Sequence, residues 1–243
     1  MYEWYMRHIQ KTNDMIKRLI VILFSLYPIG ILAQDTTDSL RHEVLLETSM
    51  GNIRVALYNE TPLHRDNFLR LVRSGYYDGI LFHRVIANFM IQAGDSTTRH
   101  AKPGDSVGEY SPDYTIPAEI VYPRYFHKRG ALAAAREGDE ENPTRASSSA
   151  QFYIVVGKTF GETDLNHYQQ LLDEQTQGTT KFTKDIRNHY RKSGGTPHLD
   201  GQYTVFGEVV EGYDIVKKID FVRTDDYDRP IDDVRIIKAT VVK

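Results

Sequence analysis

The sequence predicts a mainly β protein built on an antiparallel closed sheet, with two main helices and an inserted pair of helices. Two observations lead to this prediction. Short segments of alternating apolar and polar residues recur along the chain, separated by turn residues. Only two segments outside residues 158–197 have the apolar spacing of a main helix. Many short strands with few helices are typical of a closed antiparallel sheet.

Composition sets the broad class. The chain has 243 residues, of which 40% are hydrophobic and 26% charged, which is ordinary for a soluble globular protein. A net charge of −3 gives no basic footprint for nucleic acid, so we expect no nucleic-acid partner. There is no cysteine, which excludes disulfides and thiolate chemistry. The nine histidines are scattered without metal-ligand spacing, so we predict no metal and no cofactor.

The N-terminal segment resembles an export signal. Lys17-Arg18 precedes a short apolar run that ends in a small residue, and polar residues follow. We therefore predict a signal peptide over residues 1–33, with Met15 as a possible true start, and a linker over residues 34–41. The run is shorter than the roughly 20 apolar residues of a spanning helix. The mature chain is thus expected to be exported to the periplasm without a membrane span. The alternative is an uncleaved segment that anchors the protein to the membrane.

The predicted folded domain, residues 42–243, begins with a β-hairpin whose strands lie on either side of Met50-Gly51-Asn52. A helix is expected next, with the Thr61 hydroxyl as its N-cap and proline at its first position. Gly75 is expected to end this helix. The apolar segment 82–95 then predicts two strands that meet near Ala87-Asn88.

The middle of the chain alternates loops with apolar segments. Residues 96–123 are rich in Gly, Pro, Ser and Asp and predict irregular structure. Residues 131–135 have small side chains, which let another group approach the backbone closely. Residues 151–156 predict a strand. The segment 158–197 has two apolar stripes at helical spacing and predicts a helical insertion. We expect these stripes to pack onto the barrel; the alternative is a face that binds a protein partner.

The last part of the chain predicts a strand over residues 203–210, the second main helix from Tyr213 and a final strand over 234–242. Three segments, two earlier in the chain and one in this last part, carry the residues of a known family pattern. They are Phe82-His83-Arg84-Val85-Ile86-Ala87-Asn88-Phe89-Met90-Ile91-Gln92-Ala93-Gly94-Asp95, Gln151-Phe152-Tyr153-Ile154, and Leu199-Asp200-Gly201 leading into Val205-Phe206-Gly207-Glu208. In order, spacing and identity they resemble the cyclophilins, the peptidyl-prolyl cis/trans isomerases. The resemblance covers about His42 to Lys243 apart from the insertion. It implies an eight-stranded antiparallel closed β-barrel capped by two α-helices.

The resemblance also implies the site. Arg84 stands at the position of the catalytic arginine, and Gln92 at that of the amide that holds the substrate and the arginine. The other positions matching the family's substrate cleft are His83, Phe89, Met90, Ala135, Arg136, Gln151, Tyr153, His198, Leu199 and Tyr203. At Ala135 and Arg136 the family uses backbone groups to grip the peptide.

Two departures from the family pattern affect the cleft. Tyr153 replaces the usual phenylalanine, and its hydroxyl needs water or a partner. His198 replaces the tryptophan of cyclosporin-sensitive members, which predicts weak binding of cyclosporin A.

An arginine suits the implied reaction for a physical reason. Amide resonance gives the peptide bond a barrier of about 18–20 kcal/mol. At the twisted midpoint the proline nitrogen regains a lone pair, so a donor aimed at it stabilises the transition state selectively. We therefore expect Arg84 to act on proline-containing unfolded or extended polypeptides and to accelerate the folding of exported proteins. The competing hypothesis is a non-catalytic chaperone or assembly module of the cell envelope that binds peptides in the same cleft and at the insertion.

Overall fold

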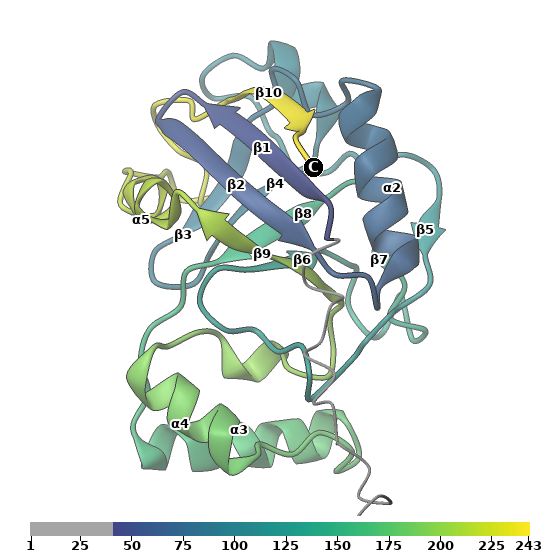
Figure 1. Ribbon diagram of the computed structural model, residues 1–243. Helices are drawn as coiled ribbons and strands as arrows, with labels where there is room; N and C mark the ends of the chain where they lie inside the picture. The colour runs from purple at the N-terminus through teal and green to yellow at the C-terminus, as the bar shows by residue number, and fades with distance from the viewer. Residues whose placement is uncertain (1–40) are drawn as a thin grey trace, which may run out of the picture. The chain divides into compact units, whose positions relative to one another are not determined.

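The computed structural model of the protein describes residues 41–243 (Figure 1). The predicted signal peptide and, except for Arg41, the predicted linker lie outside this range. Eight strands form one antiparallel sheet. In their order across the sheet they are β10 (Ile236–Val241), β1 (Glu43–Thr48), β2 (Gly51–Leu57), β9 (Val205–Glu211), β6 (Ala131–Ala134), β8 (Phe152–Val155), β4 (Met90–Ala93) and β3 (Phe82–Ile86). The predicted hairpin and the predicted pair of strands in 82–95 are both confirmed.

The sheet is curled but open, so the prediction of a closed barrel is wrong. The two edge strands, β3 and β10, do not pair along their lengths. At their first residues three hydrogen bonds cross the gap, from Gly79 N to Ile236 O at 2.7 Å, from Phe82 N to Val234 O at 2.8 Å and from Ile236 N to Ile80 O at 2.8 Å. Further along β3, Val85 N donates to Asp228 O in a turn before β10. A turn therefore occupies the edge that a paired strand would need for closure.

The two main helices, α2 (Pro62–Arg73) and α5 (Tyr213–Asp220), flank the sheet (Figure 1). Both contribute buried apolar side chains, such as Phe68 and Val216, to the main core. The Thr61 hydroxyl does not cap α2 as expected, because it donates to Tyr58 O. The Glu119 carboxylate caps the helix instead, accepting from the N–H groups of Leu63 and His64 at 3.0 Å each.

Side-chain alternation along β6 and β8 separates two apolar clusters. Even-numbered residues of both strands lie in the main core, inside the curl of the sheet. Odd-numbered residues, including Ala133 and Tyr153, lie in a second cluster with Met90 of β4 and Leu199. This second cluster lies on the opposite face of the strands and forms the floor of the site described below.

The predicted insertion is a pair of helices, α3 (Glu162–Gln175) and α4 (Lys184–Lys192), that lies apart from the sheet (Figure 1). Its apolar stripes form a third core of their own, which also includes Tyr122 and Phe126 from the segment before β6. Leu165, Leu172 and Tyr190 in this core are fully buried. The stripes are therefore not an exposed face for a partner, and they meet residues of a loop rather than the core of the barrel.

The connections are irregular, as predicted. They contain two 3₁₀ segments, η2 (Ser96–His100) and η3 (Pro197–Leu199), and a ribbon of two short strands, β5 (Thr115–Ile116) and β7 (Ser147–Ser148). None of the helices within residues 41–243 combines the length and hydropathy that crossing a bilayer requires.

Candidate active site

One row of paired residues runs across four strands and sets the geometry of the site. Arg84 of β3 pairs with Gln92 of β4, Gln92 pairs with Tyr153 of β8, and Tyr153 pairs with Ala133 of β6. Paired residues in adjacent strands project from the same face of a sheet. Antiparallel pairing thus places the predicted arginine, amide and tyrosine side by side, although they lie far apart in the sequence.

A small cavity of about 140 Å³ lies over this row. Every one of its lining residues belongs to the set that the sequence resemblance implied. They are Arg84, Phe89, Met90, Gln92, Ala135, Arg136, Tyr153, Leu199 and Tyr203. Pockets for drug-sized ligands measure about 300–1,000 Å³. The small cavity therefore fits one compact side chain, with a cation at its border.

Arg84 remains accessible at this border, with 46% of its side chain exposed. Its Nε donates to the carboxylate of Asp228 at 3.3 Å. Among residues 41–243 its two terminal amino groups have no hydrogen-bond partner. An exposed ion pair of this kind contributes about 1 kcal/mol or less. Arg84 is therefore steered by Asp228 and keeps its terminal N–H groups for another acceptor.

Gln92 has a different partner from the one expected. Its amide nitrogen donates to Gln151 Oε1 at 2.8 Å, not to a group that holds Arg84. The amide nitrogen of Gln151 donates in turn to the carbonyl oxygens of Gly108 and Tyr110, at 2.9 and 3.1 Å. Gln151 does not line the small cavity. It orients Gln92 and ties it to the loop after η2.

The backbone at Ala135 and Arg136 is only partly available to a peptide. Ala135 N donates to Gln151 O at 3.0 Å, and Ala135 O accepts from Ser148 N at 2.8 Å. No hydrogen bond within residues 41–243 uses the backbone N–H of Arg136. The guanidinium of Arg136 is held by Asp139 at 2.6 Å and lies 4.4 Å from the centre of the Tyr203 ring. Arg136 is thus a fixed wall whose free backbone donor is its N–H.

The hydroxyl of Tyr153 finds a buried partner. Tyr153 is 5% exposed, and its oxygen lies 2.9 Å from Nε2 of His127. Nδ1 of His127 lies 3.0 Å from Oδ1 of Asp200, which also accepts from the His127 backbone N–H at 2.8 Å. Burial raises the pKa of Tyr153 well above its ordinary value. The phenol therefore stays protonated, and its hydroxyl is satisfied away from the small cavity.

The two predicted cleft histidines lie outside the small cavity. His83 is 3% exposed, because it follows the opposite side of β3 from its neighbour Arg84. Burial lowers its pKa to about 4. His198 packs behind Phe89, with ring centres 5.3 Å apart, and burial lowers its pKa to about 4 as well. Of the two, only His198 is seen to support a residue that lines the cavity, Phe89.

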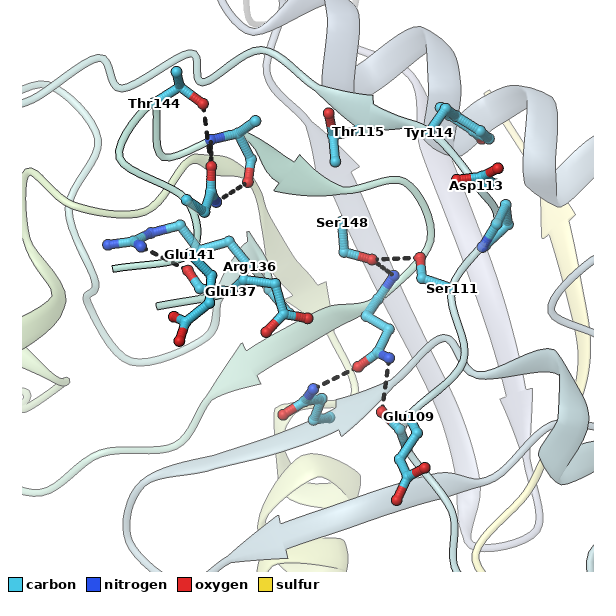
Figure 2. A pocket seen from close by; sticks show the side chains of 17 residues that line it. Glu109, Ser111, Asp113, Tyr114, Thr115, Arg136, Glu137, Glu141, Thr144 and Ser148 are labelled. Atoms are coloured by element: carbon cyan, nitrogen blue, oxygen red, sulfur yellow. Dashed lines mark hydrogen bonds between the residues drawn. The ribbon is translucent and has the colours of Figure 1, made fainter. Parts of the chain in front are cut away.

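A wide cavity of about 760 Å³ adjoins the small one and shares Gln92, Ala135 and Arg136 with it. Figure 2 shows Glu137 and Glu141 on one side and Ser111, Asp113 and Tyr114 on the other. Glu109 also lines it. These four carboxylates form no ion pair within the described part of the chain, and its one cation, Arg136, is already paired. The wide cavity is therefore open and acidic.

Sequence reasoning missed several residues that support the site. His127 and Asp228 each hold a lining side chain by a hydrogen bond, and Asp200 holds His127. Asp200 lies in a turn motif, which explains its type without revealing its partners. No sequence signal marks Asp228 as a neighbour of Arg84. No three His, Asp or Glu side chains of residues 41–243 gather as a metal site would require.

Comparison with known proteins supports the fold and the activity. Residues 43–241 match the model of the family described as cyclophilin type peptidyl-prolyl cis-trans isomerase/CLD. The chain is 31% identical over 203 residues to peptidyl-prolyl cis-trans isomerase-like 1 of Aspergillus fumigatus, covering 83% of this chain and 96% of that protein. It is 33% identical over 202 residues to the isomerase ppi1 of Schizosaccharomyces pombe, covering 82% and 98%.

Among solved structures, a cyclophilin-type isomerase of Cryptosporidium parvum superimposes with a TM-score of 0.57 at 24% identity, covering 84% of this chain and 98% of that one. A second structure of that protein, obtained in the presence of the dipeptide Ala-Pro, gives a TM-score of 0.56, with 83% and 99% coverage. At this identity the likeness shows a shared fold. Fold, site and relatives together define an isomerase of peptide bonds. The chain belongs to the cyclophilin-type peptidyl-prolyl cis-trans isomerase family.

Proposed function

We propose that this isomerase accelerates the folding of exported proteins, with Arg84 acting on the proline nitrogen of the twisted amide. The observation that supports the assignment most strongly is the geometry of the small cavity. One accessible guanidinium borders an apolar space that fits a single compact side chain, in register with Gln92 and Tyr153. A proline ring matches that space, and its nitrogen would lie at the border where the cation is.

The proposed chemistry breaks no covalent bond and transfers no proton. The small cavity holds the ring while the preceding carbonyl swings. The lining residues Phe89, Met90 and Leu199 make the surroundings apolar, which disfavours the charge-separated planar amide relative to the twisted one. The terminal N–H groups of Arg84 gain an acceptor when the nitrogen becomes pyramidal. Gln92 and the backbone N–H of Arg136 position the rest of the peptide.

The contribution of Arg84 can be measured directly. A charged hydrogen bond is worth about 1.5–3 kcal/mol, so Arg84→Ala should lower kcat/KM about ten- to a hundredfold on an X–Pro peptide. Arg73→Ala is the matched control, because Arg73 is exposed at the end of α2. The measurement is a protease-coupled isomerisation assay with both variants checked for fold. Unchanged turnover in Arg84→Ala would refute the assignment.

The competing function is a chaperone or assembly module that binds extended peptides without turning them over. The wide cavity favours it, because it offers far more space than one proline ring needs. The same assay separates the two functions. Wild-type protein that binds an unfolded chain but does not accelerate isomerisation would establish the module and exclude the enzyme role.

The proposal of export rests on residues 1–33 alone, with their positive pair, short apolar run and polar start. Expression of the full chain followed by fractionation and N-terminal sequencing tests it. A mature form that begins near Gln34 in the periplasmic fraction is expected. A membrane-bound form that begins at Met15 would support the uncleaved anchor instead.

A further inference from the structure

The helical insertion reaches the site through one side chain. Tyr190 of α4 donates its hydroxyl to Oδ2 of Asp200 at 2.8 Å. The other oxygen of the same carboxylate holds His127, which holds Tyr153. Tyr190 and Asp200 are both fully buried, and His127 is 1% exposed. A continuous buried network thus runs from the insertion to the floor of the small cavity.

The protons in this network can be assigned from its acceptors. A carboxylate is an acceptor only, so Nδ1 of His127 carries the hydrogen that faces Asp200. A ring that carries this one hydrogen accepts at Nε2, where the Tyr153 hydroxyl is the donor. Burial raises the pKa of Tyr190 well above its ordinary value, as it does for Tyr153, so both phenols remain donors. Every member of the network then has a partner.

The backbone holds the network rigidly. Thr196 N donates to His127 O at 2.9 Å, and Gly195 N donates to Lys158 O at 3.1 Å. A side chain at position 195 would collide with the carbonyl oxygen of His127 and with the ring of Tyr190. Glycine at this position therefore lets the end of the insertion approach both His127 and Tyr190 closely.

We propose that Tyr190 is a positioning residue of the active site, which holds the Tyr153 hydroxyl in place through Asp200 and His127. The insertion is then a part of the small cavity's support and not an appended surface. When the network is intact, the hydroxyl points away from the space meant for the ring. When it is disturbed, the imidazole can turn or change tautomer, and the hydroxyl is left to face the apolar cavity. The proposal rests on the isomerase activity and on Tyr153 lining the cavity.

A double-mutant cycle tests this coupling. In the wild-type background, Tyr190→Phe removes one hydrogen bond and should lower kcat/KM about two- to tenfold. In a Tyr153→Phe background the same change should have little effect, because no hydroxyl remains to be held. Tyr122→Phe is the matched control, since the Tyr122 hydroxyl donates within the insertion core, to Lys181 O at 2.8 Å, and lies outside the network. A loss of equal size in both backgrounds, or no loss in the wild type, would overturn the proposal.

A spectroscopic measurement on the wild-type protein tests the proposal without relying on the folding of a variant. The ¹⁵N shifts of the His127 imidazole in the wild type should show a neutral ring protonated at Nδ1, with Nε2 accepting a hydrogen bond. Tyr153→Phe should move the Nε2 signal toward the value of an unbonded nitrogen. A wild-type ring protonated at Nε2 would overturn the proposal. This readout does not involve Arg84, so it distinguishes failure of the network from failure of the catalytic assignment.

Discussion

The small and the wide cavity share a wall, but they differ in the elements and the residue types that line them. The small cavity is built around four side chains whose place is set by strand pairing, those of Arg84, Met90, Gln92 and Tyr153, and its floor is apolar. The wide cavity is lined mainly by loop residues after η2 and around β7, and it is polar and acidic. Gln92, Ala135 and Arg136 belong to both. The difference indicates a division of tasks, in which the sheet fixes the group that reacts and the loops adapt to what flanks it.

The largest expected effect comes from placing a charge in the small cavity. Leu199→Asp would bring a carboxylate against the bound ring, at a cost of about 3 kcal/mol or more. This corresponds to about a hundredfold loss in kcat/KM. Thr144→Asp places the same group at the wide cavity, where exposed carboxylates already lie, and should change kcat/KM little. Steady-state kinetics on both variants make the comparison. Similar losses in the two would show that the cavities do not differ as described.

The next effect concerns pH and stability rather than catalysis, because no histidine lines either cavity. His83 has a folded pKa of about 4, below the ordinary value of about 6.5. Below pH 6.5 the unfolded state therefore binds a proton that the folded state does not, so stability falls as the pH falls toward 4. Between about pH 7.5 and pH 5, His83 should lower the free energy of unfolding by about 2 kcal/mol.

Urea unfolding at the two pH values measures this loss. His83→Gln cannot titrate and should show a correspondingly smaller difference between them. His198, whose pKa is also lowered to about 4, titrates in the same direction and should account for part of the pH dependence that remains in this variant. If His83→Gln kept the full pH dependence, the burial of His83 would not be its cause.

The smallest effect is charge selection by the wide cavity. Peptides with lysine near the proline should have a higher kcat/KM than otherwise identical peptides with glutamate. Exposed pairs are worth about 0.2–1 kcal/mol, so a two- to fivefold preference is expected at low salt, which about 1 M salt should remove. Glu137→Gln should reduce the preference, whereas Glu174→Gln on the exposed side of α3 should not. A preference that persists at high salt would argue against an electrostatic origin.

Much of the small cavity could be predicted from the sequence for a physical reason. Arg84, Met90, Gln92 and Tyr153 lie on strands, where a period of two fixes the face and the pairing fixes the neighbours. His83 was nevertheless predicted to line the cleft. Because side chains alternate along β3, His83 projects from the opposite face to its neighbour Arg84 and is buried. The resemblance located the position in the chain, but the alternation decides which of two adjacent residues reaches the cavity.

The hydrogen-bond partners could not be predicted in this way. Arg84 and Asp228 are 144 residues apart, and His127 and Asp200 are 73 apart. No periodicity connects such pairs, since they meet only after the loops fold back. The open edge of the sheet was missed for a related reason. Local patterns identify β3 and β10 as strands, but they do not show that the Asp228 turn lies along β3 where a paired strand was expected.

The close approach of Lys158 and Gly195 has a consequence for how the chain accommodates α3 and α4. The two ends of the insertion meet at a hydrogen bond of 3.1 Å, so β8 and η3 need not separate to admit it. A long loop whose ends already lie together adds little closure entropy. In terms of topology the segment is therefore dispensable, and a chain rejoined across that hydrogen bond could trace the same sheet. Its removal would nevertheless take the Tyr190 hydroxyl away from Oδ2 of the buried Asp200, so the segment is chemically part of the domain that it interrupts.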